Sequence, residues 1–387
     1  MARESGRGRI LSGMRPTGKL HLGNYMGALH SWAKLQHEYE CYFFIADLHA
    51  LTTDYADLRK LRENRSEVIL DFLAGGLDPK VCTIFVQNKV PAHSELNVLL
   101  SNITPLSWLE RVPTYKDQQE QLREKDLATY GFLGYPLLQS ADILLYKPKY
   151  VPVGQDQAAH VEITREIARR FNFLYGTPGT KEVLGFDTLV NMLGERRARF
   201  YSPEGKPVIQ TAISQEDLDK ANDIGDLITA DSILPEPDVL LTPSPKLPGL
   251  DGRKMSKSYG NTILLSEEEP VLRQKLKGMV TDPARVRRTN PGNPDVCPVF
   301  DLHKVFSSAE VQAEAAEGCR TAGIGCIQCK GWLADAVVKE LAPIQERRRH
   351  YEANPAEVEA ILEAGNARAN ERANETMREV RAAMGID

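Results

Sequence analysis

Two lysines three positions apart stand in a short loop that could hold a polyanion. Lys254 and Lys257 belong to the run Lys-Met-Ser-Lys-Ser, and Gly252 and Gly260 flank it. Lysine ammonium groups are mobile point charges that can follow a phosphate, and serine hydroxyls add short hydrogen bonds. The alternative interpretation of such a loop is a solvated basic turn. The choice between the two depends on the other chemistry in the chain.

A second candidate segment follows the first apolar run, Ile10-Leu11. Residues 16–24 read Pro-Thr-Gly-Lys-Leu-His-Leu-Gly-Asn. Glycines at 18 and 23 allow backbone N–H groups to approach phosphate oxygens closely, and His21 adds a side-chain donor. A lone histidine is usually a satisfied surface or core residue. The position of His21 in a Gly-x-x-His-x-Gly turn after a strand favours a contact with a ligand.

An aspartate lies in an otherwise apolar helical segment. Gln139 and Asp142 are three residues apart in the run 134–146, so they share one face of the predicted helix. Burying a carboxylate is costly unless something donates to it. Asp142 therefore either pairs with an arginine or a backbone N–H, or it accepts a hydrogen bond from a ligand N–H in an apolar pocket. The polar turn 154–157 that follows could hold a ribose hydroxyl or an α-ammonium group.

Four of the six cysteines cluster toward the C-terminus with the spacing Cys-x21-Cys-x6-Cys-x2-Cys. They are Cys297, Cys319, Cys326 and Cys329. The Cys-x2-Cys pair forms a tight turn that points two thiolates at one centre, and four thiolates fit a closed zinc site or an iron–sulfur cluster. Spacing alone leaves both open, and zinc is the commoner structural ion. Cys41 and Cys82 lie in apolar runs and are predicted to be small buried hydrophobes.

The pattern of apolar runs indicates which elements position these residues. Strands are predicted at 9–13, 41–46, 82–87 and 151–153, and helices at 24–38, 57–73, 94–103, 134–146 and 158–171. Alternation of strand and helix is typical of an α/β protein with a Rossmann-like parallel sheet, whose ligands bind at the carboxyl ends of the strands. Beyond residue 265, helical patterns dominate.

Composition is that of an ordinary globular protein of two or three domains. The formal net charge is -5 over 387 residues, so contact with RNA would require local basic patches. The candidates are 285–288 and 347–349, and each by itself is interpreted as a solvated face. The N-terminus has charges but no apolar stretch typical of a signal peptide, and no apolar run reaches membrane-spanning length. We expect a cytoplasmic protein without a membrane partner.

Taken together, the two charged segments resemble the signatures of class I aminoacyl-tRNA synthetases, the "HIGH" turn (here His21-Leu-Gly-Asn24) and the "KMSKS" loop. Runs at 45–52, 135–146, 151–157, 160–165 and 343–347 are similar to those of the tryptophanyl-tRNA synthetases. The likeness covers about 9–176 and 235 to the end. Arg15 and Gln139 depart from the family, because many bacterial members carry glutamine and methionine there.

The resemblance implies a role for each matching residue. Catalysis of phosphate chemistry is implied for His21, Lys116, Lys254 and Lys257. Binding of ATP is implied for Arg15, Pro16, Thr17, Gly23, Asn24, Gly154, Gln155, Asp156, Leu247, Lys254, Met255, Ser256, Lys257 and Ser258. Binding of tryptophan is implied for Asp142, which would accept the indole N–H, and for Tyr135, Gln139, Gln157 and His49. A subset of the family carries a [4Fe–4S] cluster on cysteines of very similar spacing, so the resemblance favours that cluster over zinc.

The resemblance also implies an organisation and an activity. A Rossmann-like catalytic domain would span 1–176 and 235–264, with a helical insert at about 93–130, and 265–387 would form a helical anticodon-binding domain. Residues 177–234 would be an insertion whose role we cannot assign. The implied enzyme is a homodimer that uses ATP and Mg²⁺ to activate L-tryptophan and transfers it to tRNA(Trp). The alternatives are a tyrosyl-tRNA synthetase, a non-catalytic RNA-binding paralogue and a small-molecule adenylating ligase.

Overall fold

A five-stranded parallel sheet organises the part of the chain that the computed structural model describes, which is residues 8–56, 58–112, 128–154, 158–176, 232–241 and 247–387. The strand order is β3-β2-β1-β4-β5. The strands are β1 (Arg9–Met14), β2 (Glu40–Ile45), β3 (Thr83–Val86), β4 (Tyr150–Val153) and β5 (Asp238–Leu241). The predicted Rossmann-like α/β class is confirmed, whereas β5 was not among the predicted strands.

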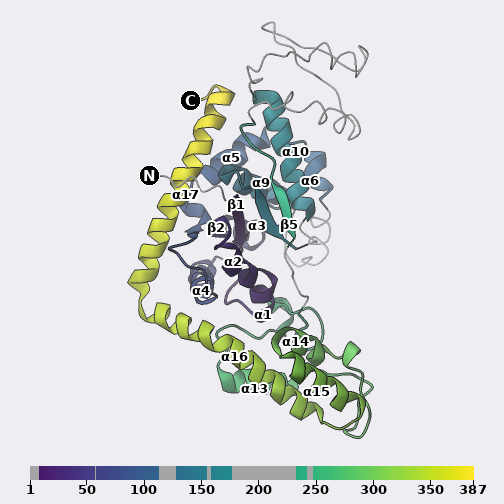
Figure 1. Ribbon diagram of the computed structural model, residues 1–387. Helices are drawn as coiled ribbons and strands as arrows, with labels where there is room; N and C mark the ends of the chain where they lie inside the picture. Colours follow the sequence, from purple (N-terminus) through teal and green to yellow (C-terminus); the bar gives the residue numbers. More distant parts are fainter. Residues whose placement is uncertain (1–7, 57, 113–127, 155–157, 177–231, 242–246) are drawn as a thin grey trace, which may run out of the picture.

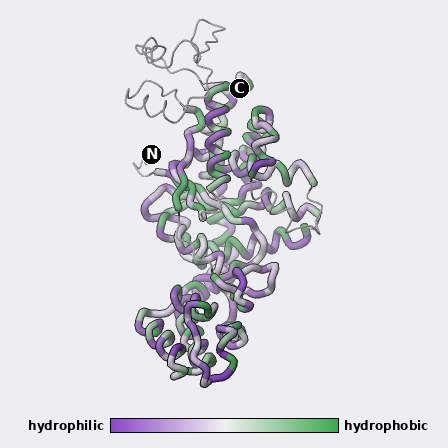
Figure 2. Tube along the Cα trace, turned by 90° about the vertical axis from the view of Figure 1, so that its right-hand side faces the viewer, coloured by the Kyte–Doolittle hydropathy of each residue, from purple (hydrophilic) through white to green (hydrophobic). Residues whose placement is uncertain are grey.

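The sheet is covered on both faces because its side chains alternate between two hydrophobic cores. Ile10 and Phe43 belong to one core, and their neighbours Leu11 and Phe44 belong to the other. The first core is covered by α1 (Leu22–Asn24), a π-helical turn (Tyr25–Leu29), α2 (His30–Leu35) and α4 (Leu61–Ala74). The second is covered by α5 (Ala92–Ser101), α9 (Tyr135–Tyr146) and α10 (Ala158–Tyr175). Figure 2 shows hydrophobic segments inside the sheet-containing part.

The order of the strands reverses beside β1. After β1 the chain moves outward through β2 and β3, and it then returns to place β4 and β5 on the other side of β1. Such a switch point opens a crevice at the carboxyl ends of the two central strands. Residues 15–21 follow β1 at that edge, and Gly154 follows β4. The fold therefore directs both predicted ligand-binding turns to one edge of the sheet.

Shorter elements complete the sheet-containing part. They are α3 (Asp47–Asp54), the 3-10 turn η2 (Gln87–Lys89), α6 (Leu106–Glu110) and α8 (Tyr130–Leu133). Of these, α3 was not predicted as a helix, and it carries His49. Cys41 and Cys82 are buried and free, as predicted. None of the described helices has the length and apolar character that crossing a membrane requires.

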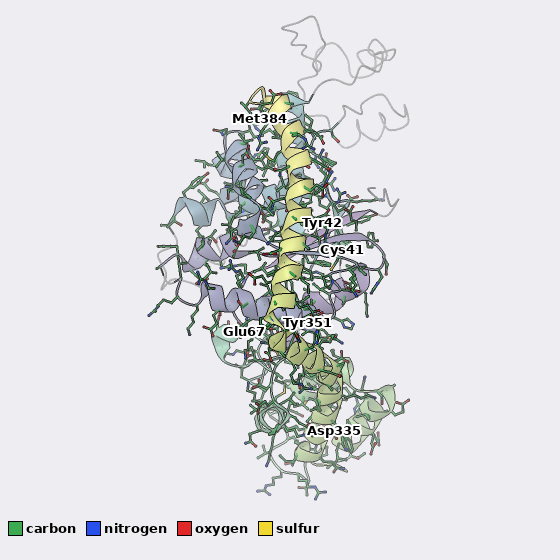
Figure 3. The ribbon with its side chains drawn as sticks, turned by 90° about the vertical axis from the view of Figure 1, so that its left-hand side faces the viewer. Cys41, Tyr42, Glu67, Asp335, Tyr351 and Met384 are labelled. Carbon is green, nitrogen blue, oxygen red and sulfur yellow. The ribbon has the colours of Figure 1, made fainter. Side chains whose placement is uncertain are left out.

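The C-terminal third is helical and returns to the sheet (Figure 1). Its elements are the 3-10 turns η4 (Lys257–Tyr259) and η5 (Pro294–Val296), and the helices α13 (Glu269–Gly278), α14 (Pro298–Phe306), α15 (Ala309–Arg320), α16 (Cys326–Ala353) and α17 (Pro355–Met384). Helix α17 runs along the sheet-containing part, as Figure 3 shows, and packs on β3, α5 and α9. Ala369 and Met377 of α17 belong to the second core. The predicted domain boundary near 265 stays a prediction.

The arginine run 347–349 is not a solvated face, so this prediction is wrong for its central residue. Arg348 is only 3% exposed and pairs with Asp71, Glu67 and Glu352. Arg347 donates through Nε to the carbonyl of Ala74 at 2.7 Å. The cause is the packing of α16 on α4, which turns one side of this helix toward protein instead of water.

Close packing of α17 on β3 yields a test of stability. A Cβ atom at Gly365 would lie 1.8 Å from the carbonyl oxygen of Ile84, whereas one at Gly331 in α16 would meet nothing within 4 Å. We expect Gly365→Ala to lower the free energy of unfolding by about 1–3 kcal/mol through overpacking. The matched Gly331→Ala should raise it by up to about 1 kcal/mol, because alanine favours a helix. Denaturant titration followed by circular dichroism measures both, and equal effects would contradict this packing.

Candidate functional site

His21 is held in the turn after β1 by a reciprocal pair of hydrogen bonds. It is the N-cap of α1, where its Nδ1 accepts from the Asn24 backbone N–H at 3.3 Å and its own N–H donates to Asn24 Oδ1 at 3.2 Å. Asn24, which occupies the last position of the HIGH signature in this chain, therefore closes the turn through these two hydrogen bonds. Because Nδ1 accepts, we assign the proton of the neutral ring to Nε2, which is left as a donor.

The surroundings keep His21 neutral at pH 7. Burial, and next the charge of Lys257, lower the pKa of His21 to about 4. Gly23 has no room for a side chain, because a Cβ there would lie 2.9 Å from the His21 ring. Gly18 has a φ of 100°, a conformation that side chains rarely adopt. The two glycines of the motif are thus required by the shape of the turn.

Lys257 of the KMSKS loop is docked onto the same turn. Its Nζ donates to the Gly18 carbonyl at 2.8 Å and to Thr17 Oγ1 at 3.2 Å. Burial lowers the pKa of Lys257 to about 8, and the nearby carboxylate of Asp71 acts in the opposite direction. Lys254 is exposed. Among the described residues, it is Lys257 and not Lys254 that forms hydrogen bonds with the turn.

The segment after the loop fixes this docking. Leu22 N–H donates to the Ile263 carbonyl and Leu265 N–H donates to the Leu20 carbonyl, each at 2.9 Å. His21 and Leu264 thereby form an antiparallel bridge. Residues 20–22 of the His21 turn and residues 263–265, which follow the KMSKS loop, are thereby joined into one small ribbon.

Asn261 shapes the loop from inside and was not predicted as a site residue. Its Oδ1 accepts from the Ser256 N–H at 2.8 Å, and its Nδ2 donates to Asp251 Oδ1 at 2.7 Å and to the Lys254 carbonyl at 3.2 Å. The side chain is 3% exposed. Asparagine near a glycine turn is common, so the sequence carried no signal for this role.

Asp142 lies at the centre of a buried polar network. Its Oδ2 accepts from His49 Nε2 at 2.8 Å, its Oδ1 accepts from His93 Nδ1 at 2.6 Å, and Gln87 Nε2 donates to both oxygens at 2.8 and 2.9 Å. His93 Nε2 lies 2.9 Å from the Tyr146 hydroxyl. Burial raises the pKa of Asp142, but the charge of His93 and the bonds from both histidines outweigh it, so the net pKa is lowered.

This network agrees with the first interpretation of Asp142, in which protein groups satisfy the carboxylate, and the ligand interpretation stays a prediction. The carboxylate is satisfied by protein donors, although by histidines and a glutamine instead of an arginine or a backbone N–H. Two bonds reach each oxygen, which is the full capacity of a carboxylate. His93 and Gln87 are 0% exposed, whereas His49 is 9% exposed. His49 is therefore the partner that a ligand donor could replace. Gln87, His93 and Tyr146 were not predicted, because long-range packing brings them to Asp142.

A second polar cluster surrounds Tyr135. Gln139 Oε1 lies 2.7 Å from His160 Nδ1, and the His160 ring lies 5.6 Å from that of Tyr135. His160 is 3% exposed and fixes the orientation of the Gln139 amide, leaving its NH₂ group as a donor. The sequence run 160–165 carried the family resemblance, but His160 was not among the predicted site residues.

Arg15 follows β1 and reaches α3. Its Nη2 donates to Thr53 Oγ1 and lies 3.5 Å from Asp54 Oδ2. Its buried Nε has no hydrogen-bond partner among the described residues. Burial lowers the pKa of Arg15, and the charges of Asp54 and Tyr135 act in the opposite direction. Arg15 therefore brings a partly buried guanidinium with one unsatisfied nitrogen to the segment after β1.

The structure places most predicted ligand residues at one edge of the sheet. The turn contributes Arg15, Pro16, Thr17, Gly23 and Asn24, and the loop contributes Met255, whose N–H donates to the Leu247 carbonyl at 2.9 Å. Gly154 ends β4 at the same edge. Lys116, Gln155, Asp156 and Gln157 lie outside the described residues.

The four clustered cysteines face one cavity in the helical region. Cys297 is the N-cap of α14, Cys319 lies in the last turn of α15, and Cys326 and Cys329 lie in the first turn of α16. They line a cavity of about 20 Å³ together with Asp282 and Arg285. Burial, followed by the neighbouring thiols, raises the pKa of Cys329 to about 12. In the described part of the chain, no group of three or more Cys, His, Asp or Glu side chains is arranged to hold a metal ion.

An open groove lies beside this cavity. It is lined by Thr281, Arg285, Val286, Arg287, Arg288, Gly325, Cys326, Ile327 and Gln328. Arg287 and Arg288 are exposed, and so are the apolar side chains of Val286 (83%) and Ile327 (61%). The exposed arginines give this groove a local positive charge that attracts anionic groups.

Comparison with known proteins gives consistent relatives. The model of the family "tRNA synthetases class I (W and Y)" matches residues 3–195 and 214–342. The chain is 50% identical to a "Tryptophan--tRNA ligase" of Ralstonia nicotianae, covering 98% of each, and 46% identical to one of Thermotoga maritima, covering 98% of this chain and 99% of the relative. It also resembles a crystal structure of tryptophanyl-tRNA synthetase from Campylobacter jejuni complexed with ADP and tryptophan. That match has a TM-score of 0.76 and 28% identity, covering 97% of this chain and 99% of the other.

The environment of His21 yields a direct titration test. We expect ring NMR to give His21 a pKa of about 4, and Lys257→Met to raise that pKa only in part, because burial is the larger cause. Between pH 6.5 and about 4, the unfolded chain binds a proton at His21 that the folded protein does not. His21 therefore lowers the free energy of unfolding as the pH falls through this range. A wild-type pKa near 6.5 would contradict the buried geometry.

Proposed function

The chain belongs to the class I tRNA synthetases that serve tryptophan and tyrosine, and from this we propose how its described residues carry out the tryptophan–tRNA ligase reaction. The enzyme activates L-tryptophan with ATP and transfers it to tRNA(Trp), as its full-length relatives named "Tryptophan--tRNA ligase" support. One observation carries the mechanism: Lys257 is hydrogen-bonded to the His21 turn at Gly18.

The reaction has two steps and needs no covalent enzyme nucleophile. A carboxylate oxygen of tryptophan attacks the α-phosphorus of ATP, a P–O bond forms, and the bond to the bridging oxygen of pyrophosphate breaks. A ribose hydroxyl at the 3′ end of the tRNA then attacks the carbonyl carbon of tryptophanyl-adenylate, and AMP leaves. The enzyme contributes alignment and stabilisation of the charge on the five-coordinate phosphorus.

We assign ATP to the edge where the two signatures meet. The neutral His21 can donate through Nε2, and Lys257 brings a positive charge to the same place. Thr17 and Gly18 would add contacts to the nucleotide, and Met255 packs against Gly23, since its Cβ lies 3.6 Å from where an added Cβ at Gly23 would be. Lys254 on the exposed side of the loop would meet the outer phosphates. Mg²⁺ bound to those phosphates would neutralise further charge, and Lys116, Gln155 and Asp156 stay predictions.

We assign the indole ring to the pocket above Asp142. The indole N–H would take the place of His49 Nε2–H on Asp142 Oδ2, because His49 is the most exposed donor of the network. Tyr135 and the NH₂ group of Gln139 would hold the polar end of the amino acid, with Gln157 as a further predicted contact. A substrate without an N–H would leave the network unchanged and gain no bond, which disfavours phenylalanine.

We propose that the helical region from 265 onward contacts the tRNA. Support comes from the groove at 285–288, where exposed arginines lie beside exposed apolar side chains.

We propose a homodimer as well. The candidate contact residues are large hydrophobic side chains exposed on three helices, namely Val98 on α5, Leu106 on α6 and Tyr130 on α8. A contiguous patch of such side chains would be typical of a surface that another chain covers. We propose a cytoplasmic location, where tRNA is charged.

We further propose that the four cysteines hold a [4Fe–4S] cluster. Support comes from the four thiols, which all line one cavity, and from their spacing, which resembles that of family members with such a cluster. Arg285 lies there as a counter-charge. The cluster would supply a cross-link between α14, α15 and α16.

The function is tested by ATP–pyrophosphate exchange. We expect exchange with tryptophan and not with tyrosine, and we expect Asp142→Ala to raise the KM for tryptophan by about tenfold or more, because a hydrogen bond to a charged group is lost. Exchange with tyrosine instead would keep the mechanism but indicate a tyrosyl-tRNA synthetase. Absence of exchange with either amino acid, from folded protein, would indicate the non-catalytic RNA-binding paralogue.

The cluster is tested by anaerobic purification. We expect about four iron and four sulfide ions per chain and a brown protein. Cys326→Ser should lower the iron content, whereas the matched Cys82→Ser should not, because Cys82 is buried elsewhere beside the Asp78 carbonyl. A colourless protein with about one zinc ion per chain would refute the cluster.

A further inference from the structure

A buried carboxylate accepts a hydrogen bond from the backbone of the turn that carries His21. Asp71 of α4 is 0% exposed, and its Oδ2 accepts from the Leu20 backbone N–H at 2.6 Å. Leu20 directly precedes His21 and pairs with Leu265 on its other side. The position of the turn therefore depends on where this carboxylate is held, because a buried N–H strongly favours an acceptor.

The other oxygen of Asp71 is held by the helical region. Arg348 of α16 donates through Nη1 to Asp71 Oδ1, through Nη2 to Glu67, and through Nε to Glu352 at 2.8 Å. Each nitrogen of the guanidinium has a carboxylate partner, so its rotation is restricted. In Figure 3, Glu67 lies beside Tyr351 of α16, where this helix meets α4. Helix α16 thus contacts the carboxylate that binds the turn.

The same helix also holds the opposite strand of the ribbon. Gln345, one turn before Arg348, donates through Nε2 to the Leu265 carbonyl at 3.2 Å and to the Glu267 carbonyl at 2.8 Å. The KMSKS side of the ribbon is therefore fixed by Gln345, and the His21 side is fixed by Arg348 through Asp71. One helix determines how the two signatures lie relative to each other.

The charge of Asp71 reaches the catalytic loop as well. Burial lowers the pKa of Lys257, and the negative charge of Asp71 partly offsets this by raising it. Arg348 is surrounded by three carboxylates, so the cluster has an excess of negative charge that the ammonium of Lys257 partly balances. Asp71 is thus close to both signatures, although it belongs to neither.

We propose that Asp71 is a positioning residue for tryptophan activation: its hydrogen bond to Leu20 N–H aligns the ATP-binding turn, and Arg348 of α16 holds Asp71 in place. This inference rests on the proposed function of the two signatures. It links the helical region that would contact tRNA to the edge that would bind ATP. No nucleotide contact is assigned to Asp71 or Arg348 themselves.

Stability and positioning can be separated with a paired substitution. Replacing both members of a buried ion pair by apolar residues of similar size often leaves stability unchanged, whereas removing one leaves an unpaired charge. In Asp71→Leu/Arg348→Met the two most buried charges are gone, whereas Glu67 and Glu352 keep theirs at partly exposed positions, and Leu20 N–H has lost its acceptor. Asp71→Asn keeps an oxygen for that N–H. The pair Arg381–Glu95, which joins α17 to α5 at 2.6 and 2.7 Å, offers a matched control away from the turn.

The experiment measures tryptophan-dependent ATP–pyrophosphate exchange and thermal unfolding for the wild type and these variants. For the double variant we expect kcat of exchange to fall by about tenfold or more, with the KM for tryptophan changed by less than about twofold, since alignment of ATP is lost and the amino-acid pocket is intact. Asp71→Asn should retain kcat within about threefold. Arg381→Gln should match the wild type.

Three results would overturn the proposal: a folded double variant with wild-type kcat, an Asp71→Asn variant as slow as the double variant, or an equal loss in Arg381→Gln. If the double variant does not fold, Asp71→Ala compared with Asp71→Asn gives the same contrast, because both leave Arg348 its bonds to Glu67 and Glu352. A wild type inactive with both amino acids would reject the proposed function itself. An active wild type with unaffected variants would reject only this inference.

Discussion

The pairing of residues 20–22 with residues 263–265 is the constraint on which the site depends. Two backbone hydrogen bonds of 2.9 Å join segments that the sequence separates widely. Without this ribbon, the lysine loop would be a solvated turn, which is the usual fate of such a sequence. With it, Lys257 is desolvated and pressed against the His21 turn, so its charge acts in surroundings where water screens it less.

Asp142 is buried and Arg15 is partly buried, and the hydrogen bonding of these two charged groups differs. Around Asp142 every lone pair is used, so the carboxylate remains ionised although it is 1% exposed. Around Arg15 the bonding is incomplete, because Nε has no described partner. A further donor can therefore reach Asp142 only by displacing one of its present partners, whereas Arg15 Nε still has bonding capacity for a ligand.

The helical region and the sheet form one continuous structure. Helix α17 contributes to the core of one sheet face, and α16 contributes to the other. A chain of buried contacts therefore runs from the cysteine cavity along α16 to Arg348 and Gln345. Cys326 and Cys329 lie at the start of this helix.

The sequence by itself determined the strand–helix alternation, the sheet class and the residue types of both signatures, because these depend on local periodicity and on glycine turns. Tertiary structure alone decided that Lys257 and not Lys254 meets the turn, that Asn261 shapes the loop, and that His49, Gln87 and His93 converge on Asp142. It also buried Arg348, which was expected to be a surface charge, among carboxylate partners. β5 is short and was not recognised. Apart from the contacts of Asn261 within its own loop, these features are long-range, because groups 39 to 277 positions apart meet only after the sheet orders its strands, and no local pattern encodes which buried polar group finds which partner.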